Sequence, residues 1–295
     1  AVTLSHNKNS VKKLTGEDVQ LWEASFGYNQ NTHIIGVNQP LGQMYGYVTD
    51  GLYQVSDFDY DEATKTYTLK DGVPYSGKKT DVKPGMWKFK NVDGSEDNKI
   101  TENDKTVIGN AYPKFYGGIN NTFTYKDFDL SIFLTYSFGN DVFNATKLTN
   151  TKTALQNKNV LDIANSSNRW VVVNKKGELI TDPQEMADIN KGKTVAAVYD
   201  NEIGDTYIHS WAVEDGSYLK LSNITLGYTF PRKMLSKIGI SKLRLYATGS
   251  NLLTWTKYSG FDPEVSTMGS GLTPGVDFGA YPKSRSFVFG INLAF

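Results

Sequence analysis

The residues best suited to chemistry lie in one acidic segment, DGSEDNKITEND. Oxygen-bearing side chains alternate at Asp93, Ser95 and Asp97, and Asp104 closes the segment at its twelfth position. Lys99 would add its backbone carbonyl, which completes the oxygen-ligand spacing of an EF-hand calcium loop. The spacing therefore predicts a calcium site formed by these five residues.

This segment departs from the calcium-loop pattern at two positions. Asn98 stands where such loops usually have glycine, although Asn also adopts left-handed backbone geometry. The closing residue, Asp104, is shorter than the usual bidentate Glu. The alternative is an acidic turn in which the Asp and Asn side chains bond the backbone and hold no metal. The sequence leaves both interpretations open, and calcium is the one cofactor that it suggests.

The rest of the sequence offers no active site. The absence of cysteine excludes disulfides, thiolate zinc sites and cysteine nucleophiles, and no two of the three histidines are spaced as a metal pair. Ser10 and Lys13 form an S-x-x-K string without the partner motifs that give it meaning. Strings of the P-loop, HExxH, GxSxG and GxGxxG types do not occur. We therefore expect a protein that is not an enzyme.

Charge balance and hydropathy exclude two further classes: nucleic-acid-binding proteins and proteins with a transmembrane helix. The 31 Lys and Arg residues balance 31 Asp and Glu residues, which argues against a nucleic-acid-binding protein. The mean hydropathy is −0.42. The longest apolar runs fall short of the roughly 18 residues that a transmembrane helix needs. On these figures alone the chain would be classed as soluble.

The elements that must position any functional residues are strands. Five segments alternate between large apolar and small or polar residues with a period of two. In the last of them, Phe287, Phe289 and Ile291 share one face with Leu293 and Phe295. The five segments are 113–125, 127–138, 219–230, 242–255 and 284–295. Weaker strands are predicted near residues 1–6, 18–28 and 41–49.

The length of these segments favours a membrane-spanning sheet. They run for about 12 to 14 residues, whereas strands of globular proteins usually have about 5 or 6. A transmembrane β-strand needs roughly 9 to 11 residues, with apolar side chains facing lipid and aromatic residues at its ends. A soluble β-sandwich is the alternative, because its strands also alternate. We predict an antiparallel transmembrane β-barrel.

Two long polar stretches, about 50–111 and 139–215, separate the strands. In such barrels, long loops are extracellular and short turns are periplasmic. The second stretch begins with a predicted helix at residues 144–159 and contains Trp170, with Trp211 near its end. These two rings are candidates for contact with a substrate or a partner protein, and packing inside the loop is the alternative.

Several blocks of the sequence resemble SusC/RagA-family TonB-dependent transporters of Bacteroidetes outer membranes. They follow the family's order from about residue 40 onward. The blocks are LGQMYGYVTDGLYQ, DKTVIGNAYPKFYGGINNTFTYKDFDLSIFL, VEDGSYLKLSNITLGYTFP, NLLTWTKYSGFDPEVS and PGVDFGAYPKSRSFVFGINLAF.

The resemblance implies an integral outer-membrane importer of a Gram-negative, Bacteroidetes-like cell. It would take up oligosaccharides or peptides together with a SusD-like surface lipoprotein. In the family, the TonB complex acts through an N-terminal TonB box and a plug domain, and nothing in this sequence resembles either. Residues 1–295 thus look like the C-terminal part of a barrel that in large transporters has about 22 strands. A secreted or periplasmic all-β glycan-binding module is the alternative.

The last residue also has an implied role. Phe295 and the alternating apolar residues before it resemble the C-terminal signal that the outer-membrane insertion machinery recognises. An aromatic ring at the membrane interface is the alternative role for Phe295.

Overall fold

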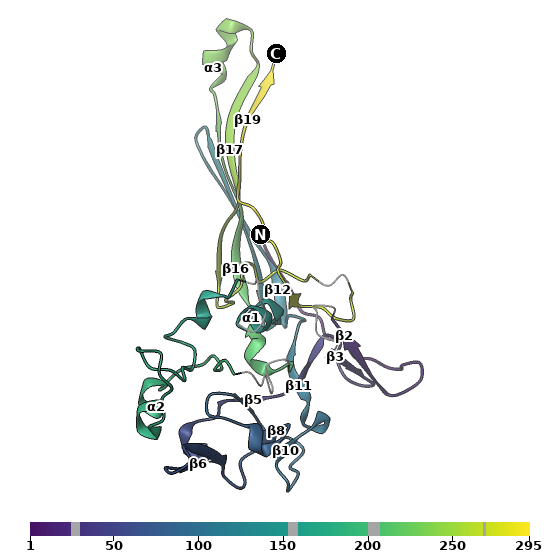
Figure 1. Ribbon diagram of the computed structural model, residues 1–295. Coiled ribbons are helices and arrows are strands. Elements are labelled where there is room, and N and C mark those ends of the chain that lie inside the picture. The colour runs from purple at the N-terminus through teal and green to yellow at the C-terminus, as the bar shows by residue number, and fades with distance from the viewer. Residues whose placement is uncertain (25–29, 153–158, 200–206, 268–269) are drawn as a thin grey trace.

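A computed structural model describes residues 1–24, 30–152, 159–199, 207–267 and 270–295. The chain is mostly antiparallel β-structure and has two visibly different parts (Figure 1). A long, narrow sheet extends away from a wider part that contains short strands and helices. Within the described residues, no helix has the length and apolar character needed to cross a membrane.

The narrow part is a six-stranded antiparallel sheet in the order β1-β12-β13-β16-β17-β19. We call it the long sheet. It contains all five strands predicted from the sequence, and the weak strand near residues 1–6 joins them as β1. The bounds are β1 Val2–Ser5, β12 Phe115–Tyr125, β13 Phe128–Phe138, β16 Tyr218–Thr229, β17 Lys242–Thr256 and β19 Ser286–Ala294.

The register of the long sheet places apolar side chains opposite one another. Phe123 pairs with Leu130 across β12 and β13, and Ile132 pairs with Ile224 across β13 and β16. The row continues to β19, where Phe289 lies opposite Ala247. A one-residue shift would turn each strand's apolar set to the other face, so this pattern fixes the pairing.

A β-bulge in β16 keeps its apolar side chains on one face. Ser222 has no partner in the ladder, because Phe133 pairs with Asn223 whereas Leu134 pairs with Leu221. The apolar positions of β16 are therefore odd-numbered before Ser222 and even-numbered after it, as at Ile224. One inserted residue of this kind reverses the alternation of the strand that follows it.

The long sheet is open among the described residues. Its outer strands, β1 and β19, each pair with one neighbour and not with each other. The sequence predicted the C-terminal portion of a larger barrel, and within the described residues the strands form an open sheet and no closed barrel. Six strands fall far short of the number around a large transporter lumen.

The wider part, which we call the base, is built from short elements. A four-stranded sheet has the order β11-β4-β3-β2, and β14 lies between β15 and β18. The bounds are β2 Val19–Glu23, β3 Asn31–Gly36, β4 Gln43–Gly46, β5 Thr49–Leu52, β6 Phe58–Asp61, β7 Thr66–Leu69, β8 Tyr75–Ser76, β9 Trp87–Phe89, β10 Lys99–Ile100, β11 Thr106–Asn110, β14 Asp141–Asn144, β15 Val213–Asp215 and β18 Val276–Asp277.

Helices are short. Of the helix predicted at 144–159, only Ala145–Asn150 is helical among the described residues, as α1. The Asn144 side chain accepts a hydrogen bond from the Lys147 N–H at 2.8 Å at the start of this helix. Residues 153–158 of that prediction lie outside the described residues. The α-helices are α1 Ala145–Asn150, α2 Pro183–Ile189 and α3 Arg232–Leu235, and the 3₁₀ helices are η1 Val55–Asp57, η2 Lys79–Asp81, η3 Glu102–Asp104, η4 Asp162–Ala164, η5 Ser210–Ala212 and η6 Ser236–Ile238.

The two long polar stretches are folded rather than extended. They share one buried cluster, in which Trp87 and Phe89 from the first stretch pack with Trp170 and Met186 from the second. A second cluster surrounds Tyr53 within the first stretch. The hydrophobic core of the described residues therefore lies in the base and near its junction with the long sheet.

Candidate functional site: a two-faced sheet and its ion-pair clamp

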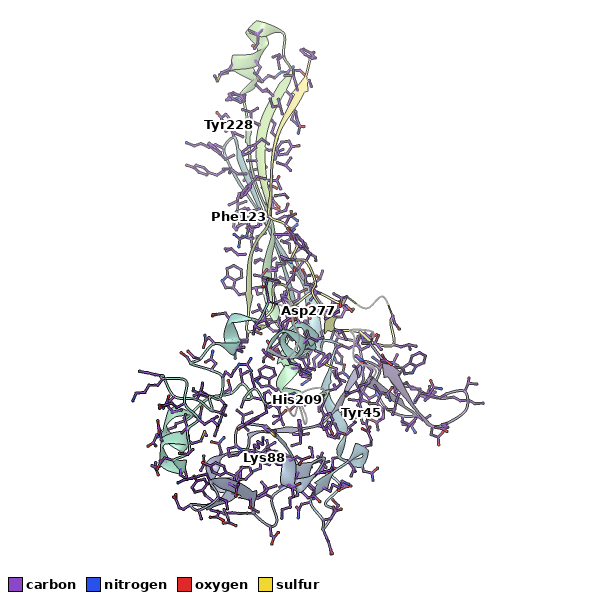
Figure 2. All side chains as sticks on the ribbon, in the orientation of Figure 1. Tyr45, Lys88, Phe123, His209, Tyr228 and Asp277 are labelled. Atoms are coloured by element: carbon purple, nitrogen blue, oxygen red, sulfur yellow. The ribbon has the colours of Figure 1, made fainter. Side chains whose placement is uncertain are left out.

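The long sheet exposes its apolar face. Among the described residues, no buried apolar side chain belongs to any of its six strands, whereas Phe123 is 57% exposed and Phe289 is 79% exposed. Phe123 and Tyr228 lie on this sheet in Figure 2, far from the base. An exposed apolar surface that spans several strands is unusual for a soluble monomer and marks a face that contacts lipid or another protein.

The opposite face of the long sheet is polar and hydrogen-bonded. The hydroxyls of Thr225 and Thr248 bond each other at 2.8 Å across β16 and β17. Ser250 donates to the Asn223 side chain at 2.7 Å. These side chains satisfy one another across the strands, so this face is suited to contact with water.

An arginine crosses three strands on this polar face. The guanidinium of Arg244 in β17 contacts both carboxylate oxygens of Asp129 in β13, at 3.0 and 2.5 Å. Gly227 of β16 lies between them, and a Cβ there would collide with both side chains. The glycine thus allows a two-point ion pair to pass over the central strand.

A second ionic group fixes a loop to the same face at the end near the base. Lys220 of β16 is 3% exposed, and its ammonium lies 2.5 Å from Glu264 and 3.5 Å from Asp262. Tyr218 donates to Glu264 at 2.8 Å, and Lys283 contacts the same carboxylate at 2.9 Å. We call these five residues the clamp, because they hold residues 262–264 against β16.

The clamp keeps Glu264 ionised. Burial alone would raise its pKa, but hydrogen bonds from Lys220, Lys283 and Tyr218 outweigh burial and lower the pKa to about 2. A buried lysine is costly unless its charge is paired, so the clamp is a unit in which each partner needs the other.

The acidic segment forms a loop held by its own side chains. Asp104 is fully buried, and its carboxylate accepts hydrogen bonds from the N–H groups of Val92 and Asp93, at 2.8 and 3.3 Å, and of Thr101, at 2.8 Å. Asp97 accepts from the Lys99 N–H at 3.0 Å.

These contacts match the turn alternative of the sequence analysis. Asp93 accepts from the Ser95 N–H at 2.9 Å, and Asn98 has a φ of 54°, in the left-handed region. Within the described ranges, no group of three or more His, Cys, Asp or Glu residues could hold a metal ion. Calcium at Asp93, Ser95, Asp97, Lys99 and Asp104 stays a prediction that rests on spacing.

Trp170 packs inside the base. It is 2% exposed, and its ring lies against Gly85, where a Cβ would collide with it. Gly85 has a φ of 86°, so both its conformation and the close ring favour glycine. This position corresponds to the packing alternative, and contact of Trp170 with a substrate or a partner stays untested.

Trp211 lies in an aromatic group around a buried histidine. Its ring centroid is 4.9 Å from that of Trp87, and the Lys147 ammonium lies 4.1 Å above it. His209 is fully buried beside Trp87 and hydrogen-bonds the Thr49 hydroxyl at 2.7 Å. Burial, followed by the charges of Lys152 and Lys147, lowers the pKa of His209 to about 3.

Phe295 follows β19 and is 87% exposed. The role of Phe295 as an insertion signal stays a prediction. The sequence analysis did not identify the clamp or the His209 group. Lys220 is an ordinary polar position in the alternation of LKLSN, and its partners lie 42 and 44 positions away.

Comparison with known proteins finds similarity to TonB-dependent receptors. No protein-family model matches the chain. The chain is 32% identical over its whole length to TonB-dependent receptor P3 of Formosa agariphila, and covers 26% of that protein. It is 25% identical to TonB-dependent receptor SusC of Bacteroides thetaiotaomicron, with 99% of this chain and 24% of SusC aligned.

Solved structures agree on the fold. The whole chain superposes on 26% of a chain in the structure of the RagAB peptide transporter, with a TM-score of 0.65 and 19% identity. For the RagAB peptide importer in its closed-closed state, the TM-score is 0.66 at 18% identity.

The relatives are transporters and not enzymes, which confirms the prediction that the chain is not an enzyme. The chain spans about a quarter of the length of the curated relatives that it matches. Over its whole length it is therefore homologous to part of a SusC/RagA-type TonB-dependent receptor.

Proposed function

We propose that this chain is the C-terminal part of the membrane-spanning barrel of an outer-membrane TonB-dependent importer. The observation that carries the proposal is the long sheet with one exposed apolar face and one hydrogen-bonded polar face. The apolar face would contact lipid, and the polar face would line the lumen. The remaining strands and the plug would come from the rest of the receptor.

The base would lie on the extracellular side. The strands of the long sheet are joined at its far end by short connections, the tight turn at Lys126 and the segment 230–241 that contains α3. The connections at the near end are the long folded stretches. Short periplasmic turns and long extracellular loops are the rule in outer-membrane barrels. The base would then be available to a SusD-like surface lipoprotein and to the oligosaccharide or peptide that the importer takes up.

Fractionation of the full receptor tests the membrane assignment. We expect the receptor to remain in the membrane fraction after a high-salt wash and to be released only by detergent. Recovery in the soluble fraction would contradict the proposal and support the alternative, a secreted or periplasmic glycan-binding module.

A second measurement addresses the importer activity. Cells that lack the receptor should lose uptake of one oligosaccharide or peptide class, and the full receptor should co-purify with a SusD-like lipoprotein. Normal uptake together with membrane insertion would support the barrel assignment and contradict the transport role.

A further inference from the structure

The end of the long sheet farthest from the base has the layered chemistry of a membrane interface. We call it the tip and define it as residues 125–128 and 228–242. Aromatic rings form its first layer: Phe128 lies 4.7 Å from Tyr228, which lies 4.9 Å from Phe230, measured between ring centroids. Aromatic rings of this kind gather at the level of lipid headgroups.

Cationic side chains lie among and beyond these rings. Lys126 has a φ of 53° in the tight turn between β12 and β13, and its ammonium lies 5.3 Å above the Tyr125 ring. In α3, Arg232 and Lys233 are both exposed. None of these three cations takes part in a salt bridge among the described residues.

Negative charge near the tip does not balance these cations. Asp129 is paired with Arg244, so it contributes no free charge. Asp127 is half-buried in the turn and supplies one negative charge against the three cations. The tip therefore carries a net positive charge.

Exposed apolar side chains accompany the cations. Met234 is 62% exposed and Ile238 is 66% exposed, whereas Leu235 between them is buried. A turn that only faces water would have no need for two exposed apolar side chains in addition to its cations. A short segment with exposed apolar and basic side chains suits the boundary between acyl chains and headgroups.

From this arrangement we propose that the tip binds anionic phospholipid, with Lys126, Arg232 and Lys233 contacting the phosphate-bearing headgroups. The inference rests on the proposed function, because it needs the long sheet to span a membrane. Basic residues next to a membrane surface are attracted to anionic lipid, and each adds a factor of about five in affinity. Charge complementarity and the aromatic layer favour a lipid over a soluble anion as the occupant.

The test compares lipids retained by the full receptor. The receptor is reconstituted in vesicles containing equal amounts of phosphatidylglycerol and phosphatidylethanolamine, extracted in mild detergent, and its bound lipids are quantified by mass spectrometry. We expect phosphatidylglycerol to be enriched. The Arg232→Ala, Lys233→Ala double variant should lose about fivefold of that enrichment for each charge removed.

Two controls make the result specific. Lys175→Ala, Lys176→Ala removes an equally exposed adjacent pair from the base and should leave the enrichment unchanged. Arg232→Lys, Lys233→Arg keeps both charges and should retain it, which separates charge from local folding. High salt should weaken the enrichment, because mobile ions screen exposed charges.

Equal enrichment in the wild-type receptor and the Arg232→Ala, Lys233→Ala variant would overturn the inference. Displacement of the lipid by inorganic phosphate at equal charge would also overturn it, since it would indicate a general anion site. A receptor that stays in the bilayer without preferring phosphatidylglycerol rejects only this inference. A receptor that does not enter the bilayer rejects the proposed function itself.

Discussion

The long sheet and the base place their apolar and charged side chains in opposite ways. In the base, aromatic side chains such as Phe89 and Trp170 are buried, and charged groups lie mostly outside. In the long sheet, Phe123 and Phe289 are exposed while Lys220 is buried in ion pairs. The base carries its apolar core within the chain, whereas the long sheet needs an apolar medium to complete it. One chain therefore contains parts adapted to two solvents.

The largest loss of stability is expected from a substitution in the base. Phe89 is fully buried, with ring centroids of Tyr47 and Tyr207 within 5.6 Å. Phe89→Ala should cost about 3 to 5 kcal/mol of local stability, because it removes buried area and leaves a cavity. Hydrogen exchange of the full receptor should show loss of protection in β9 while β13 is unchanged. Equal loss in β13 would mean that the two parts do not fold separately.

A charge on the apolar face of the long sheet should have a somewhat smaller effect. Ile132→Arg would place a guanidinium in lipid near the middle of β13. This should lower the free energy of unfolding by about 2 to 4 kcal/mol. Ser131→Arg, its neighbour on the polar face, is the matched control and should be tolerated. The measurement is guanidinium unfolding of the receptor in vesicles. Equal tolerance of both variants would contradict the assignment of the two faces.

Acid should destabilise the base at a higher pH than it destabilises the clamp. An unfolded histidine takes up a proton near pH 6.5, but buried His209 does so only near pH 3, so protonation favours unfolding of the base as the pH falls between these values. At about pH 5 the loss is about 2 kcal/mol. Glu264 has a depressed pKa, so the clamp keeps its contribution to the free energy of unfolding until the pH falls below about 4.5. It loses this contribution as the pH falls toward about 2.

Oxidative footprinting of Trp87 and Trp211 across this pH range checks the expectation. Their exposure should rise before the contact between residues 262–264 and β16 is lost. A His209→Gln variant, which cannot gain the proton, should show a flatter pH dependence. A wild-type base that stays closed down to pH 4 would contradict the role of His209.

The smallest effect is expected in the acidic loop. Asp104→Ala removes an acceptor for three backbone N–H groups, and should cost about 1 kcal/mol because the freed groups can reach water. Asp97→Ala should change nothing measurable when calcium is absent. Calorimetry with calcium alone decides between the two sequence hypotheses, since a bound ion would make both variants lose affinity.

The strands of the long sheet were predictable because each contains its own evidence. Alternation in a segment such as 284–295 needs no partner to be recognised, and the length of the run points to lipid. The reversal at Ser222 was visible only once β13 and β17 were seen beside β16. The clamp was not predictable, because Lys220 and Glu264 are 44 positions apart and neither belongs to a motif.

The base was harder to predict than the long sheet. Its strands are two to six residues long, which is too short for a periodic pattern to stand out. Trp87, Trp170 and His209 come together only through contacts between the two polar stretches. Composition made those stretches look like solvated loops, because Asp, Lys, Asn and Gly are interspersed among their apolar residues. For the acidic segment, side-chain spacing alone did not separate a metal loop from a set of turns.

The pairing of β1 with β12 has a consequence for the order of assembly. Thr3 and Gly118 bond each other across 115 positions, whereas β12 and β13 are joined by a two-residue turn. Closing a long loop costs more entropy than closing a hairpin, so local pairs should form first. Until β1 arrives, one side of β12 presents unpaired N–H and C=O groups. That interval is when a competing strand, or a chaperone that shields the edge, would act on this chain.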